Sequence, residues 1–200
     1  MIKPFWRKNP LDEKETILLE KTLDAHRLAA FRQNASSEVI KLAFQTNGED
    51  LTKAVAAGLC TLGGLHAPII QTQGLLSDLQ VMGAGGIMGM WDGNSKIPGW
   101  GNHFCKGKPD PIVDNVMLYL AIGWPKLSSH IQDVTAILHG EGKKIYPNMA
   151  CATAATGLII GMPPTLTPIL LLQGRTMAWA EIIYDASRTT PTEKLRPIPR

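Results

Sequence analysis

Residues 145–174 read IYPNMACATAATGLIIGMPPTLTPILLLQG and contain no Asp, Glu, Lys or Arg. An uncharged stretch of this length could cross a bilayer as one helix. Pro163, Pro164 and Pro168 lie in its middle, however, and proline breaks a helix because it lacks the backbone N–H and clashes with the preceding turn. The stretch therefore predicts two buried helices joined by a proline turn, and a transmembrane span is the weaker interpretation.

Helical patterns continue on the N-terminal side of this stretch and beyond it. Apolar residues recur at helical spacing, and Asn, Ser, Asp, Gly and Pro mark the ends of the segments. No run of alternating β-branched residues indicates a sheet, so the predicted fold class is all-α. The expected helices span residues 11–23, 39–44, 54–62, 66–79, 111–122, 128–138, 150–160 and 168–185, followed by an extended tail over 188–200.

Glycines accumulate between residues 83 and 107, and we expect an extended loop there. Functional residues concentrate in such loops when a rigid scaffold holds them. The segment GAGGIMG at 83–89 is not a dinucleotide-binding motif, because no strand precedes it and the Gly-x-Gly-x-x-Gly spacing is absent. We interpret it as a flexible connection.

Composition excludes several classes of protein. Of 200 residues, 44% are hydrophobic and 18% charged, which allows a substantial core and excludes a disordered chain. The net charge of +3 makes no case for nucleic-acid binding. The three cysteines form no CxxC pair, so we expect neither a metal site nor a disulfide framework. We therefore expect a cytoplasmic location, where thiols stay reduced.

Five histidines are candidates for acid–base chemistry: His26, His66, His103, His130 and His139. His66 follows a glycine pair at a predicted helix start, where backbone N–H groups favour anions. His103 lies at the end of the glycine-rich segment. A structural, hydrogen-bonded role is the alternative for either residue, and the pattern favours neither interpretation.

Arg175 is the only Lys or Arg between Lys144 and Arg188, and it lies in an otherwise apolar helical segment. A cation there is costly unless it is paired. Glu181 is six residues further on, which places it on another helix face. Arg175 therefore either reaches the surface or another helix's carboxylate, or binds a ligand carboxylate at a cleft.

The order of several motifs resembles the citrate synthase superfamily, which includes citryl-CoA lyases. DLTKAVAAG (50–58) and LGGLHAP (62–68) are similar to the approach to its first catalytic histidine. PGWGNH (98–103), followed by Asp110-Pro111, is similar to its Gly-Phe-Gly-His…Asp-Pro loop. YPNMA (146–150) resembles its Pro-Asn-Val-Asp segment, and GRTMAW (174–179) resembles its arginine-bearing helix.

This resemblance implies a fold like the C-terminal half of citrate synthase, without the N-terminal part of the large domain. Residues 1–62 would resemble the end of the large domain, 63–160 the small domain with a loop at 83–107, and 161–200 a C-terminal helix and tail. The family makes or breaks a carbon–carbon bond between an acyl-CoA and a keto acid. The resemblance therefore implies that coenzyme A carries the acyl group and that the chain forms a homodimer. We expect no metal cofactor and no nucleic-acid or membrane partner.

The resemblance also implies roles for single residues. His66 would stabilise the enol, and His103 fits the second histidine because of its seven-residue step to Asp110. Counting forward from Gly99 places Asn102 there instead. The residues that would bind substrate carboxylates are Arg175, Asn102 and Arg196, and those near coenzyme A are Gly99, Gly101, Lys106 and Lys108.

The chain departs from the family pattern at the catalytic positions. Ala150 replaces the aspartate, Leu28 and Phe31 replace a His-x-x-His pair, and Ile112 replaces an arginine. Loss of a positioned base typically costs about 10²–10⁴ in rate. We therefore expect an acyl-CoA lyase or synthase with altered specificity. The alternatives are an inactive relative that serves as a CoA- or carboxylate-binding or assembly subunit, and a chain completed by a partner that supplies the missing N-terminal region.

Overall fold

The computed structural model describes residues 6–7, 9–32, 35–46, 50–61, 68–93, 95–102 and 104–189. These residues form α-helices and no strand beyond an isolated bridge between Trp100 and Pro147, which confirms the predicted fold class. The helices are α1 (Glu13–Ala30), α2 (Ala35–Thr46), α3 (Leu51–Thr61), α4 (Pro68–Gly89), α5 (Pro111–Gly123), α6 (Pro125–Gly140), α7 (Met149–Ile159) and α8 (Pro168–Thr189).

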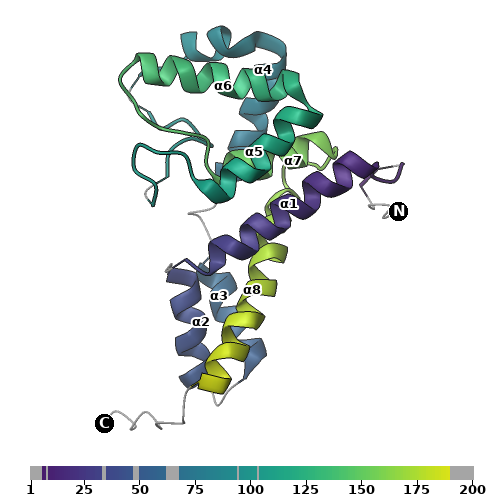
Figure 1. Cartoon of the computed structure of the whole chain (residues 1–200), viewed down its shortest axis with the longest axis vertical. Helices are drawn as coiled ribbons and strands as arrows, with labels where there is room; N and C mark the ends of the chain where they lie inside the picture. Colours follow the sequence, from purple (N-terminus) through teal and green to yellow (C-terminus); the bar gives the residue numbers. More distant parts are fainter. Residues whose placement is uncertain are drawn as a thin grey trace.

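The helices form two lobes (Figure 1). One lobe contains α4, α5, α6 and α7, whose apolar side chains share a core with the inner face of α1. The other contains α2, α3 and the C-terminal part of α8, packed around the buried Trp179. Helix α8 therefore packs beside α1, although the two are far apart in the sequence, and α1 contacts both lobes.

A capping box fixes the start of α1. The Asp12 side chain accepts a hydrogen bond from the Glu15 backbone at 2.7 Å, and the Glu15 carboxylate accepts one from the Asp12 backbone at 2.9 Å. These contacts satisfy N–H groups that a helix start leaves without partners. The helix then extends to Ala30, past the predicted end at Leu23.

Helices α1 and α8 cross closely at Gly174. A Cβ at this position would lie 2.4 Å from the Cβ of His26 and 2.6 Å from the carbonyl oxygen of Leu23. Only glycine permits this separation, because real Cβ contacts are longer. The crossing brings His26 of α1 and Arg175 of α8 to the same interhelical space.

The proline turn between α7 and α8 confirms the two buried helices predicted from residues 145–174. The Gln73 side chain holds this turn in place, because its amide nitrogen donates to the carbonyl of Met162 at 2.8 Å and its amide oxygen accepts from the hydroxyl of Thr167 at 2.5 Å. Across the part of the chain that the structure describes, no helix has the length and apolar character needed to cross a membrane.

The expected loop at 83–107 is wrong in its first part. Helix α4 continues to Gly89 after a kink at Gly83, where φ is 69° and ψ is 171°. Ala84 and Ile87 are buried in the core of the α4–α7 lobe, and this packing outweighs the weak helix propensity of the glycines around them. Arg188 is helical too, and the tail beyond residue 189 lies outside the described residues.

Candidate functional site

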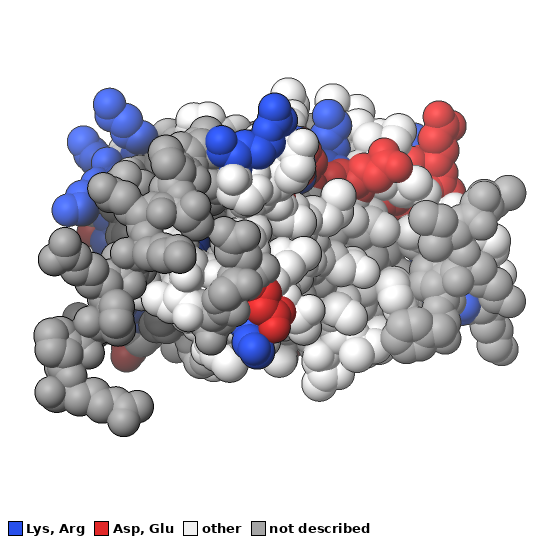
Figure 2. All heavy atoms as spheres, turned by 90° about the horizontal axis from the view of Figure 1, so that it is seen from below, with Lys and Arg blue, Asp and Glu red and all other residues white. Residues whose placement is uncertain are grey.

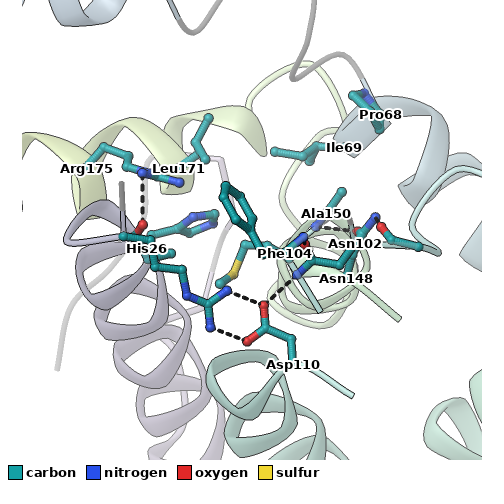
Figure 3. A pocket seen from close by; sticks show the side chains of 14 residues that line it. His26, Pro68, Ile69, Asn102, Phe104, Asp110, Asn148, Ala150, Leu171 and Arg175 are labelled. Atoms are coloured by element: carbon teal, nitrogen blue, oxygen red, sulfur yellow. Dashed lines mark hydrogen bonds and ion pairs between the residues drawn. The ribbon is translucent and has the colours of Figure 1, made fainter. Parts of the chain in front are cut away.

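A cavity of about 220 Å³ lies where the C-terminal half of α1 meets α8 and the starts of α4, α5 and α7 (Figure 3). Among the described residues that line it, His26, Arg32, Asp110 and Arg175 have side chains that can carry charge. Apolar side chains and backbone complete the lining. We call this space the arginine cavity, because two guanidinium groups face it.

The start of α7 and the loop at 99–102 form one wall. Asn148 caps α7 by accepting from the backbone of Ala150 at 2.9 Å, and its amide nitrogen donates to the carbonyl of Gly101 at 2.8 Å. Gly99 has a φ of 91°, and a Cβ there would lie 2.5 Å from Thr72. Of the two glycines predicted for coenzyme A, Gly101 lines the cavity, whereas Gly99 is buried against α4.

Arg32 and Asp110 form a bidentate ion pair across the cavity. The two guanidinium nitrogens donate to the two carboxylate oxygens at 2.6 and 2.5 Å. Asn102 donates to the same carboxylate at 2.7 Å, and the Ile112 backbone donates at 3.0 Å as Asp110 caps α5. Burial alone would raise the pKa of Asp110, but the hydrogen bonds from Arg32 and Ile112 and the charge of Arg32 outweigh it, so the pKa is lowered. Asp110 is therefore ionised and fully engaged.

Arg175 is the second guanidinium of the cavity, and it has a different environment. One of its terminal nitrogens donates to the carbonyl of Ala29 at 3.3 Å. None of the ion pairs within the described segments includes Arg175, and its buried Nε has no hydrogen-bond partner there. Burial and then the charge of Arg32 lower its pKa to about 10, so it stays cationic at neutral pH. Such a cation favours an anionic ligand.

His26 forms the floor of the cavity between Arg175 and Phe104 (Figure 3). Its side chain has no solvent-exposed surface, and its Nε2 lies 2.7 Å from the Thr153 hydroxyl. That hydroxyl donates to the carbonyl of Met149 at 2.7 Å. A threonine hydroxyl has one proton, so Thr153 accepts a hydrogen bond from Nε2–H of His26.

A second hollow of about 240 Å³ adjoins the arginine cavity, and both are lined by Asn102 and Asp110. Lys106, Lys108 and Lys144 line it, and all three are exposed. We call it the lysine hollow. Lys106 and Lys108 were predicted from the sequence to lie near coenzyme A, whereas Lys144 was missed, although it lies two residues before the Tyr146-Pro147-Asn148 motif.

The structure brings several of the predicted site residues together. Arg175, Asn102 and Gly101 line the arginine cavity, and Lys106 and Lys108 line the adjoining lysine hollow. The predicted residues His66, His103 and Arg196 lie outside the described residues.

Sequence reasoning missed Arg32, which had no motif of its own, and named His26 only as one of five candidate acid–base histidines. Glu181 forms an ion pair with Arg27 at 3.1 Å, and it is not among the described residues that line the cavity. In the segments that the structure describes, no group of three or more His, Cys, Asp or Glu side chains is placed to bind a metal ion.

The fold is shared with solved structures, although no protein-family model and no curated protein sequence matches the chain. Citryl-CoA lyase from Hydrogenobacter thermophilus is 19% identical with a TM-score of 0.78, covering 96% of this chain and 78% of that one. Citrate synthase from Thermoplasma acidophilum, in a ternary complex with carboxymethyl coenzyme A and oxaloacetate, is 20% identical with a TM-score of 0.69, covering 96% and 52%. ATP citrate lyase from Methanothrix soehngenii, in complex with citrate and coenzyme A, is 18% identical with a TM-score of 0.73, covering 96% and 35%.

These similarities confirm the citrate synthase-like fold. The chain spans about half of the citrate synthase and a third of the ATP citrate lyase.

Proposed function

We propose that the chain binds an acyl-CoA and a carboxylate-bearing keto acid and makes or breaks a carbon–carbon bond between them, as a citrate synthase or citryl-CoA lyase does. The observation that carries this proposal is Arg175. It is a half-buried cation that faces a cavity and has no acidic partner among the described residues. A carboxylate bound there would offset the cost of burying the guanidinium.

The lysine hollow supports the acyl-CoA half of the proposal. Coenzyme A is polyanionic, and three lysines stand beside the arginine cavity. A coenzyme bound over Lys106, Lys108 and Lys144 would have its acyl end directed past Asn102 toward Arg175. The solved structures with oxaloacetate and carboxymethyl coenzyme A, and with citrate and coenzyme A, have the same fold.

The departures in the cavity support a changed specificity. Ala150 lines the wall where the resemblance implies a carboxylate, while Leu28 and Phe31, which replace a histidine pair, are exposed. Arg32, two residues beyond the end of α1, supplies a second guanidinium. We infer that the keto-acid site has been rebuilt around Arg32 and Arg175. His66, His103 and Arg196 remain part of the proposed site.

A homodimer in the cytoplasm belongs to the same proposal. Leu42, Leu51 and Leu59 on α2 and α3 are 57%, 46% and 38% exposed. Figure 2, seen from below, shows uncharged side chains beside one acidic and one basic group, with further charged side chains along the upper edge. A second copy covering this surface would remove apolar area from water. Light scattering of Leu59→Glu and of the unchanged protein tests whether this surface forms the dimer interface. A dimer that persists in Leu59→Glu would contradict that assignment.

The experiment is a direct assay with acetyl-CoA plus oxaloacetate, and separately with citryl-CoA. Mass spectrometry follows coenzyme A release and the carbon–carbon products, and calorimetry measures coenzyme A and citrate binding to the same protein. Turnover that Arg175→Met abolishes supports the proposal. Coenzyme A binding without turnover in either assay favours the inactive binding or assembly subunit, or a chain that needs a partner. If the protein neither binds coenzyme A nor turns over either substrate, the proposal is overturned and only the similarity of fold remains.

A further inference from the structure

The two guanidinium groups of the arginine cavity differ in whether a protein carboxylate already occupies them. Both terminal nitrogens of Arg32 donate to the carboxylate of Asp110, at 2.6 and 2.5 Å. Arg175 donates to the carbonyl of Ala29 at 3.3 Å and takes part in none of the ion pairs within the described segments. A ligand carboxylate can therefore pair with Arg175 without breaking an ion pair described here, whereas at Arg32 it would compete with Asp110.

The carboxylate of Asp110 is firmly held in its place at Arg32. Asp110 is only 3% exposed, and its oxygens also accept hydrogen bonds from the amide of Asn102 at 2.7 Å and from the backbone of Ile112 at 3.0 Å. The second of these contacts caps the start of α5. Displacing Asp110 would leave a buried charge and a helix start without these partners, and such losses are costly. A ligand carboxylate therefore does not replace Asp110.

The ion pair changes what the cavity offers to a second ligand carboxylate. Arg32 and the ionised Asp110 together carry no net charge, so the pair does not attract a further anion at a distance. A carboxylate that approached Arg32 would also lie beside the carboxylate of Asp110, and like charges repel more strongly in a dehydrated cavity than in water. The cation of Arg175 offsets the charge of one ligand carboxylate.

Apolar side chains form much of the remaining described lining of the cavity (Figure 3). Ile69 and Leu171 are 2% and 5% exposed, and Ala150 lines the wall formed by α7. These side chains offer contact to carbon atoms and no hydrogen-bond donor to an oxyanion. Burying a charge against them is unfavourable, whereas an alkyl group loses nothing there.

We propose that Asp110 is a specificity-determining residue that takes the place of a ligand carboxylate at Arg32, so that the cavity selects a keto acid with one carboxylate, bound by Arg175, and an uncharged side chain. The inference rests on the proposed function and names the chemical class of its second substrate. An example is 2-oxobutyrate, which has a methyl group where oxaloacetate has its second carboxylate.

A series of three ligands tests this selection on the unchanged protein. Calorimetry in the presence of coenzyme A measures the affinities for 2-oxobutyrate, oxaloacetate and the 4-methyl ester of oxaloacetate. The ester removes the second charge of oxaloacetate without making the molecule smaller. We expect 2-oxobutyrate and the ester each to bind at least tenfold more tightly than oxaloacetate. The turnover of acetyl-CoA with each keto acid, followed by mass spectrometry, should have the same order in kcat/KM.

Asp110→Asn tests whether Asp110 causes the selection. The substitution removes the negative charge beside Arg32 and makes its cation available to a ligand. The affinity for oxaloacetate should therefore rise at least tenfold relative to that for 2-oxobutyrate, in protein shown by circular dichroism to be folded. Asp114→Asn is the matched control, because Asp114 is an exposed aspartate one turn further along α5. It should leave the ratio of the two affinities unchanged.

The outcomes separate this inference from the proposed function. If oxaloacetate binds the unchanged protein as tightly as 2-oxobutyrate or the ester does, the inference is overturned, and this result does not depend on how well Asp110→Asn folds. An unchanged ratio in folded Asp110→Asn overturns the role of Asp110. Coenzyme A binding without binding of any of the three keto acids also overturns the inference. Absence of coenzyme A binding overturns the proposed function itself.

Discussion

The arginine cavity and the lysine hollow share a wall but bind charge in different ways. Arg32 reaches the cavity from the segment just after α1 and is held by Asp110, whereas Arg175 reaches it from α8 and donates to the carbonyl of Ala29. The lysines of the hollow are exposed side chains on the loop and its neighbouring segment. Fixed, dehydrated cations discriminate between carboxylates by geometry, whereas solvated lysines attract any polyanion. We expect the cavity to determine specificity and the hollow to contribute affinity.

The largest expected effect on stability comes from breaking the ion pair between Arg32 and Asp110. Asp110→Asn leaves the half-buried Arg32 without its carboxylate, next to Arg175, and removes the charge that caps α5. We expect the free energy of unfolding to fall by about 2–3 kcal/mol, measured by urea denaturation. Asp24→Asn is the control, since Asp24 forms an exposed ion pair with Arg27, and it should leave the midpoint unchanged.

Acid titration examines the same ion pair by protonating Asp110 instead of replacing it. The pKa of Asp110 is lowered in the folded protein, so its ion pair stabilises the fold above the ordinary carboxyl pKa. This contribution is lost as the pH falls from that ordinary value through the lowered one. The unchanged protein should therefore lose stability faster than Asp110→Asn over this acidic range, and parallel curves would contradict the ionised state of Asp110.

Arg175→Met should separate binding from stability. The substitution removes a half-buried cation without an acidic partner in the described structure and keeps the apolar stem, so the unfolding free energy should stay constant or rise. Citrate affinity, measured by calorimetry, should fall about 100-fold, because charge-assisted hydrogen bonds to the carboxylate are lost. Arg175→Lys should recover only part of it, since lysine lacks the planar fork. A marked loss of stability in Arg175→Met would assign Arg175 a structural role instead.

Gly174→Ala tests whether the close crossing of α1 and α8 positions the cavity. The added Cβ would lie 2.4 Å from His26, so the helices must separate, at a cost of roughly 1–3 kcal/mol in unfolding free energy. Citrate affinity should fall as well. Gly85→Ala is the control: nothing lies within 4 Å of its added Cβ, and the helical position should gain about 0.5–1 kcal/mol. If the two substitutions had equal effects on stability and citrate affinity, the close crossing would not be what positions the cavity.

The two regions also differ in how far the sequence predicts them. A lone cation in an apolar segment singled out Arg175, and the proline break predicted the α7–α8 turn. The Arg32–Asp110 pair joins residues 78 positions apart, and no local pattern links them. Lys144 reaches the hollow because the backbone of Gly101 donates to the carbonyl of Tyr146, a tertiary contact. The helix over 84–89 was missed because burial of Ala84 and Ile87 outweighs glycine content.

The smallest expected effect belongs to the lysine hollow. Lys144→Ala removes one exposed cation, and an exposed charge pair contributes about 1 kcal/mol or less, so coenzyme A affinity should fall roughly threefold to fivefold. Salt screens such contacts, and the difference between Lys144→Ala and the unchanged protein should shrink between low and high ionic strength. Lys41→Ala on α2, outside both regions, is the matched control and should leave coenzyme A affinity unchanged. Citrate affinity should be the same in both variants, because the arginine cavity stays intact. A parallel loss of citrate binding in Lys144→Ala would show that the two regions act as one site.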